Sequence, residues 1–226
     1  AHEILAGCLY SWRVPDSTKM KSIRTIAIAV FLSMTMVVRA QTAATLTDLE
    51  TAAPTPGGYD VFQLSVAGQT NKPDGLNYYT DNESGHGTGE PGQTFTTGGG
   101  AAGFTLTSLA IKTGGGSSNG TGTSQSYLLH IYSVSDGTAT VIATYVAGNF
   151  SFADGDWLQW SNLNLPLATN AVYGYSFGKA SNATGGWEAM GNSSTNLYPG
   201  GELALMPVAG GAITFSSTHY YDAVFD

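Results

Sequence analysis

The sequence predicts an all-β protein: an antiparallel β-sandwich with a jelly-roll-like arrangement of strands. After Ala40, short runs of β-branched and aromatic residues alternate with clusters of Gly, Asn, Asp and Ser. No part of that region repeats its apolar residues with the 3.6-residue period of a helix. Many short strands without intervening helices are typical of two packed sheets.

The expected strands follow one another along the chain, separated by turn residues. They are Tyr59–Ser65, Gln93–Thr96, Phe104–Thr113, Tyr127–Val134, Thr138–Val146, Trp157–Leu163, Ala171–Phe177, a short piece at Trp187–Met190, Glu202–Met206, Ala212–Phe215 and Tyr220–Phe225. Ser135-Asp136-Gly137 predicts a tight hairpin, because Gly accepts the positive φ that such turns require. Asp154-Gly155-Asp156 marks a similar break before Trp157.

Side-chain alternation indicates which strands are central. Both faces of Tyr127–Val134 are partly apolar, which is expected for a strand whose second face is also covered. Trp157 and Trp160 are three residues apart, so a regular strand points them to opposite faces, and one of them is expected in the core.

The chain is expected to contain one folded domain, 57–226, whose last residues look truncated. Residues 41–56 are expected to form a linker or an edge strand. Residues 20–40 have the basic start, the uncharged apolar middle and the small-x-Ala exit of a cleaved signal peptide. The apolar run is shorter than the roughly 20 residues of a membrane-spanning helix. Residues 1–19 would then be an upstream, non-native or read-through segment, and the product would be exported without a membrane span.

Composition restricts the partners and the cofactors. After Gln41 the chain has three lysines, no arginine and 14 acidic residues, which argues against nucleic acid and anionic lipid as partners. The single cysteine, Cys8, precedes this region, so no disulfide is expected in the domain. Such a charge balance permits neutral ligands and divalent cations. No cofactor is predicted apart from a structural calcium ion.

Oxygen-rich turns are the candidate calcium ligands. Asp81, Glu83, Asp154 and Asp156 offer carboxylates in or beside predicted turns, and calcium takes six to eight oxygen ligands. Paired carboxylates of this kind also serve glycosidases, which keeps a glycan-active hydrolase or lyase as a weaker alternative. No catalytic residue is assigned, and a non-enzymatic protein is expected.

Aromatic residues near turns are the candidate ligand-binding residues. Sugar rings stack on flat aromatic faces while polar side chains take the hydroxyl groups. Trp187 follows two glycines that would leave its indole uncovered, and Tyr198, Trp160 and Tyr79 could complete a platform. These residues favour a carbohydrate-binding module as an alternative to a module without a sugar ligand.

Several short sequence segments occur in an order that is also found in a known protein family. They are Gly92-Gln93-Thr94-Phe95-Thr96-Thr97, the strand from Phe104 to Ile111, Leu129-His130-Ile131-Tyr132, Asp156-Trp157-Leu158-Gln159-Trp160 and Gly201–Met206. This order resembles the exported bacterial β-sandwich domains of choice-of-anchor proteins, many of which carry a PEP-CTERM sorting signal. The resemblance implies a jelly roll at the cell surface or in the extracellular matrix, and it implies no known activity. We therefore expect a non-catalytic secreted or surface module for adhesion or matrix structure, with an extracellular glycan or matrix partner.

Overall fold

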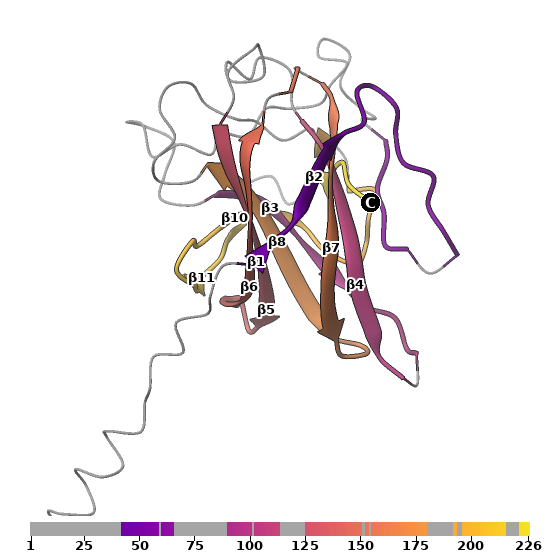
Figure 1. Ribbon diagram of the computed structural model, residues 1–226. Helices are drawn as coiled ribbons and strands as arrows, with labels where there is room; N and C mark the ends of the chain where they lie inside the picture. Colours follow the sequence, from indigo (N-terminus) through magenta and orange to yellow (C-terminus); the bar gives the residue numbers. More distant parts are fainter. Residues whose placement is uncertain are drawn as a thin grey trace, which may run out of the picture. The chain divides into compact units, whose positions relative to one another are not determined.

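The computed structural model describes residues 42–58, 60–65, 90–100, 102–113, 125–150, 152–153, 155–179, 192–193, 196–215 and 222–226, all of which belong to the unit Arg39–Asp226. In these residues every regular element is a strand, which confirms the predicted all-β class (Figure 1). The same residues contain no helix that is long and apolar enough to cross a membrane.

The larger sheet contains eight strands. Its hydrogen-bonded order is β1-β6-β5-β8-β3-β10-β12, and β11 pairs with β6 beside this path. The strands are β1 (Thr42–Ala43), β3 (Glu90–Thr96), β5 (Gln125–Ser135), β6 (Thr138–Phe150), β8 (Val172–Lys179), β10 (Leu203–Met206), β11 (Gly211–Ala212) and β12 (Thr214–Phe215).

The second sheet has the order β2-β7-β4, formed by β2 (Thr45–Asp48), β7 (Trp157–Leu167) and β4 (Phe104–Lys112). Two short strands, β9 (Asn192–Ser193) and β13 (Asp222–Ala223), pair separately. Six long strands form antiparallel pairs that are nested along the sequence. The innermost pair is β5 with β6, the next is β4 with β7, and the outermost is β3 with β8. The two sheets face each other as a sandwich, and nested antiparallel pairing is the arrangement of a jelly roll. The fold prediction is therefore confirmed.

The main core lies between the two sheets and is rich in aromatic residues. The larger sheet contributes Tyr127, Tyr175 and Phe177, and the smaller sheet contributes Leu158 and Trp160. The rings of Tyr127 and Phe177 stack with centroids 5.3 Å apart. Each fully buried large side chain contributes about 1.5–3 kcal/mol to stability. This aromatic core holds the two sheets together.

Both tryptophans of β7 are buried, although they point to opposite faces as the alternation predicts. Trp160 packs in the main core, whereas Trp157 packs on the outer face with Ala110 and Val224. The outer face of β5 is covered too, because Tyr132 packs there with Met206. The sandwich therefore has small apolar clusters outside its sheets, which makes both faces of its central strands apolar.

Local turn chemistry explains the regular hairpin and the irregular strand. Asp136 and Gly137 both have positive φ, 49° and 70°, as a two-residue type I′ turn requires, so the predicted hairpin is confirmed. In β7, Asn162 and Asn164 also have positive φ, 64° and 50°, where the pairing with β4 shifts register. Asn tolerates this conformation better than most residues, so it accommodates the bulge.

Two expectations about the N-terminal part of the domain can be compared with the structure. Residues 42–48 form strands, since β1 pairs with β6 and β2 pairs with β7. The strand expected at Tyr59–Ser65 is wrong as a regular strand, because only Gln63 forms a bridge there, with Phe225. The Gln63 side chain binds the backbone N–H and C=O of Ser65, at 2.5 and 2.7 Å, and closes a local loop instead. Residues 187–190 lie outside the described part.

Candidate functional site

A groove of about 760 Å³ is lined by the end of β3, the residues that follow it and the first half of β4. One wall is the first half of β4, from Phe104 to Leu109. The opposite wall comes from Gly58 and residues 60–62, and Tyr198 lies at the side. Core residues such as Phe95 form the floor.

The closed end of the groove is made by the C-terminal residues, which lie between the two walls. Ala110 and Asp226 exchange backbone hydrogen bonds of 2.7 and 2.9 Å, so this segment pairs with β4. On its other side, Phe225 exchanges bonds of 2.8 and 2.9 Å with Gln63. Figure 1 shows the C-terminus between β4 and the purple segment that precedes residue 65. The groove continues from this three-strand arrangement along the rest of β4.

The lining combines apolar surface with hydroxyl and carboxyl groups. Phe62 is 47% exposed, which is unusual for so large an apolar side chain, and Phe104 is partly buried beside it. Thr105 and Thr107 are exposed on the β4 wall. Asp60 and Asp226 supply the carboxylates, and burial, with a smaller contribution from the charge of Asp60, raises the pKa of Asp226. Such a surface can bind an amphipathic ligand without covalent chemistry.

Tyr198 is fixed in the groove wall by a buried aspartate. The Asp222 carboxylate accepts hydrogen bonds from the backbone N–H groups of Leu197 and Tyr198, at 2.5 and 2.7 Å, and from Gln93 Nε2 at 3.2 Å. Burial raises the pKa of Asp222, and these three donors oppose that rise. The Tyr198 hydroxyl accepts a bond of 3.1 Å from the Thr96 N–H. The ring is thus held at both ends.

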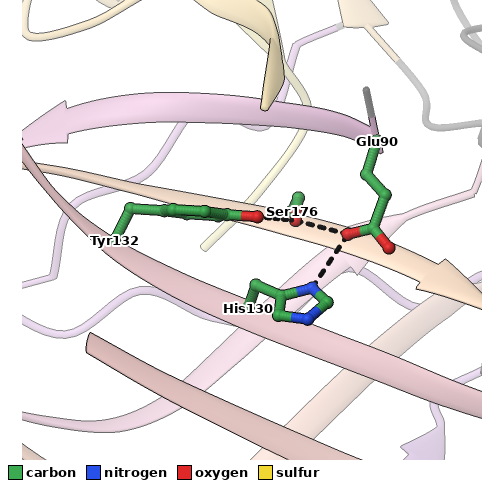
Figure 2. Close-up of polar contacts among 4 residues, drawn as sticks. All are labelled: Glu90, His130, Tyr132 and Ser176. Atoms are coloured by element: carbon green, nitrogen blue, oxygen red, sulfur yellow. Dashed lines mark hydrogen bonds and ion pairs between the residues drawn. The ribbon is translucent and has the colours of Figure 1, made fainter. Parts of the chain in front are cut away.

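A second polar cluster lies buried on the outer face of the larger sheet (Figure 2). Glu90 Oε2 accepts a hydrogen bond of 2.6 Å from Ser176 Oγ and lies 2.9 Å from His130 Nδ1. The Tyr132 hydroxyl is 3.0 Å from Ser176 Oγ. Because Ser176 uses its only proton on Glu90, Tyr132 must donate to Ser176. The cluster is therefore a chain of donors that ends on one carboxylate.

This cluster lacks the geometry of a nucleophilic triad. In a triad the hydroxyl bonds to the histidine, whereas here Ser176 and His130 both bond to the same oxygen of Glu90. The side chains of His130 and Glu90 are only 6% and 7% exposed. Burial is the main cause that raises the pKa of Tyr132, with a smaller contribution from Glu90. These properties favour a structural role.

Gly178 on β8 leaves the space that the Glu90 side chain occupies. A Cβ at this position would lie 2.3 Å from Glu90 Oε1, far inside van der Waals contact. The small residue therefore makes room for the carboxylate between β3 and β8. Sequence analysis missed this cluster, because Glu90, His130 and Ser176 are far apart in the chain and match no motif.

The predicted ligand-binding residues fall in different places. Tyr198 lines the groove. Trp160 lies wholly in the core with no exposed surface, so its assignment as a platform is corrected: Leu158 and Trp160 share the inner face of β7. Trp187 and Tyr79 lie outside the described residues. Two further aromatic residues of the groove, Phe62 and Phe104, were not singled out by the sequence.

Of the predicted calcium ligands, the structure describes only Asp156. Its Oδ2 accepts a 2.6 Å bond from the Ala153 N–H, so it serves the local turn, and its carboxylate faces Asp48. Asp81, Glu83 and Asp154 lie outside the described residues. The described part of the chain contains no group of three or more His, Cys, Asp or Glu side chains that could hold a metal ion.

Comparisons with known proteins do not add to this picture. No protein-family model, no curated protein and no solved structure matches the chain.

Proposed function

We propose that the chain is a non-catalytic β-sandwich module, exported to the cell surface or the extracellular matrix, that acts in adhesion or matrix structure by binding a partner. The observation that carries this proposal is the groove, which combines exposed Phe62 with threonine hydroxyls at the edge of a rigid sandwich. The Glu90 and His130 side chains of the second polar cluster are buried, which supports a structural use of that cluster. The resemblance to choice-of-anchor domains agrees with this setting.

A carbohydrate-binding module is the second candidate, and one observation favours it. Tyr198, predicted as a sugar platform, lines the groove near Phe62 and several hydroxyl groups. Aromatic faces beside hydroxyl-binding groups are the usual composition of a sugar site.

The test blocks the groove without disturbing the core. A Cβ at Gly58 would meet no heavy atom within 4 Å, so Gly58→Trp introduces an indole at the groove lining without a clash at its Cβ. Val208→Trp adds the same indole at a residue that does not line the groove and is 42% exposed. Binding of the full chain to immobilised cellulose, chitin, peptidoglycan and gelatin would be measured by surface plasmon resonance.

We expect the wild type to bind at least one of these polymers. Gly58→Trp should weaken that binding at least tenfold, and Val208→Trp should leave it unchanged. Equal binding by wild type and Gly58→Trp, or no binding to any polymer, would contradict the proposal.

A further inference from the structure

We propose that the groove binds an extended segment of another polypeptide, which adds as a strand to the open edge of β4. This inference rests on the proposed function, because it names the class of ligand that the same groove takes. It is carried by three observations: the orientation of the β4 backbone, the way the C-terminal residues already use that edge, and the charge at the closed end.

The backbone of Thr105 faces the groove. Thr105 lies opposite Pro166 of β7, and proline has no N–H to give to the ladder. The pair is therefore of the non-hydrogen-bonded kind, in which the N–H and C=O of both residues point away from each other. Among the described residues none pairs with Phe104–Ser108 on this side. An edge of this kind is a template for a further strand.

At the closed end of the groove, one extended segment separates the two walls. Beyond residue 109, Val224–Asp226 pairs with β4 on one side and, through Phe225, with Gln63 on the other. Strands lie about 4.8 Å apart, so one inserted strand separates its neighbours by about 10 Å. The two walls that hold Phe225 continue as the walls of the groove, which are residues 60–62 with Gly58 on one side and residues 109 to 104 on the other. An extended peptide antiparallel to β4 can pair with Phe104–Leu106, on the far side of the register shift between Leu106 and Ser108.

The lining defines the side chains of such a peptide. Residues of a strand alternate between two faces, so alternate residues of the peptide would meet the apolar floor at Phe95 and Leu167. The residues between them would lie on the face that carries Thr105 and Thr107, which are exposed. We therefore expect a segment in which apolar and polar residues alternate.

The closed end of the groove favours a basic residue. Asp60 and Asp226 both line the groove, and Oδ1 of Asp226 is buried with no hydrogen-bond partner among the described residues. The whole chain has a formal net charge of −8. A lysine or arginine in the bound segment would pair with these carboxylates.

The test selects peptides and then removes one backbone donor. A phage-displayed library of random heptapeptides would be selected for binding to the full chain, after phages that bind the Gly58→Trp variant have been removed. Thr105→Pro deletes the N–H that faces the groove but no bond to β7, and edge positions of this kind tolerate proline. Thr105→Val keeps the N–H and is the matched control. Titration calorimetry would measure binding of an enriched peptide and of its form with alternate backbone nitrogens methylated, and thermal melting would confirm folding.

We expect enriched peptides with alternating apolar residues and a lysine or arginine. Thr105→Pro should weaken binding at least tenfold, Thr105→Val less than twofold, and backbone methylation should abolish it. Asp60→Asn should weaken binding and reduce its dependence on salt.

Two results would overturn the inference. One is that no peptide is enriched on the wild-type chain relative to the Gly58→Trp variant. The other is that Thr105→Pro and Thr105→Val bind the peptide equally well. If the chain instead binds a glycan that Gly58→Trp blocks and Thr105→Pro leaves unchanged, the groove is a sugar site, so the strand inference fails while the proposed function stands. If the groove binds neither peptide nor polymer, both fail.

Discussion

At the scale of single residues, the buried polar groups illustrate how one carboxylate can satisfy several buried donors. Glu90 accepts bonds from Ser176 and His130, and Ser176 accepts from Tyr132 in turn. Asp222 does the same for two backbone N–H groups and Gln93. A sequence shows the residue types but not which distant donors share an acceptor, so neither cluster could be predicted.

Removal of the Glu90 carboxylate should destabilise the fold. Glu90→Ala leaves the buried Ser176 and His130 groups without their acceptor, at a cost of about 2–4 kcal/mol in the free energy of unfolding. Tyr132→Phe removes only the outer donor and should cost about 1 kcal/mol. Urea unfolding of both variants would measure these values. A loss below about 0.5 kcal/mol for Glu90→Ala would show that water replaces the carboxylate.

Asp48 should make stability depend on pH. Burial, followed by the nearby Asp156 carboxylate, raises its pKa above 3.8, although the Glu50 N–H opposes the rise. A raised folded-state pKa means that the ionised form is penalised, so the penalty is absent below pH 3.8 and appears as pH rises through the raised pKa.

Asp48→Asn removes that penalty and keeps the oxygen that binds the Glu50 N–H. We expect a gain at pH 7 of at most about 0.5 kcal/mol, since solvent screens this partly exposed site. The gain should vanish below pH 3.8 in chemical-denaturation curves. A gain that is the same at pH 3 and pH 7 would point to a cause other than charge.

At the scale of secondary-structure elements, the sequence predicts what local chemistry determines. The β5–β6 turn follows from Asp136-Gly137, and the long strands follow from their β-branched and aromatic runs. The irregular segment at 60–65 could not be predicted, because its bridge to Phe225 joins residues far apart in the chain. The bulge at Asn162–Asn164 depends likewise on the register with β4.

The β5–β6 turn gives a matched pair of glycine substitutions. Gly137→Ala should destabilise the domain by about 1–2 kcal/mol, because φ is 70° there. Gly148→Ala on β6 has its nearest contact at 3.7 Å and no positive φ, so it should be neutral or stabilise by up to about 1 kcal/mol. Thermal melting of the two variants would compare them. Equal effects would mean that the turn relaxes to accept alanine.

At the scale of the whole molecule, the groove arises where segments from three parts of the chain meet. Only the sandwich topology brings these segments together: Gly58 with residues 60–62, the first half of β4, and Tyr198 with the C-terminal residues. Sequence analysis could propose Tyr198 by type, but it also proposed Trp160, because composition cannot distinguish an exposed ring from a core ring. The fold class was predictable, and the position of the candidate site was not.

Export is the prediction that concerns the whole chain. Expression from Met20 in a bacterial host should yield a protein that is cut near Ala40, because the apolar run from Thr25 to Val38 precedes a small-x-Ala exit. Mass spectrometry of the periplasmic fraction would measure the new N-terminus. Periplasmic protein that still begins at Met20 would show that this segment is not a cleaved signal.

The seven residues from Thr42 to Asp48 cover an edge strand in each of the two sheets. β1 covers part of the outer edge of β6, and β2, one residue further on, covers the outer edge of β7. A single short stretch thus shields strands of both sheets, which would otherwise offer unpaired backbone to other copies. Trimming by a protease just inside this stretch would uncover β6 and β7 together, and the shortened protein would tend to precipitate or form fibrils even though its aromatic core is intact.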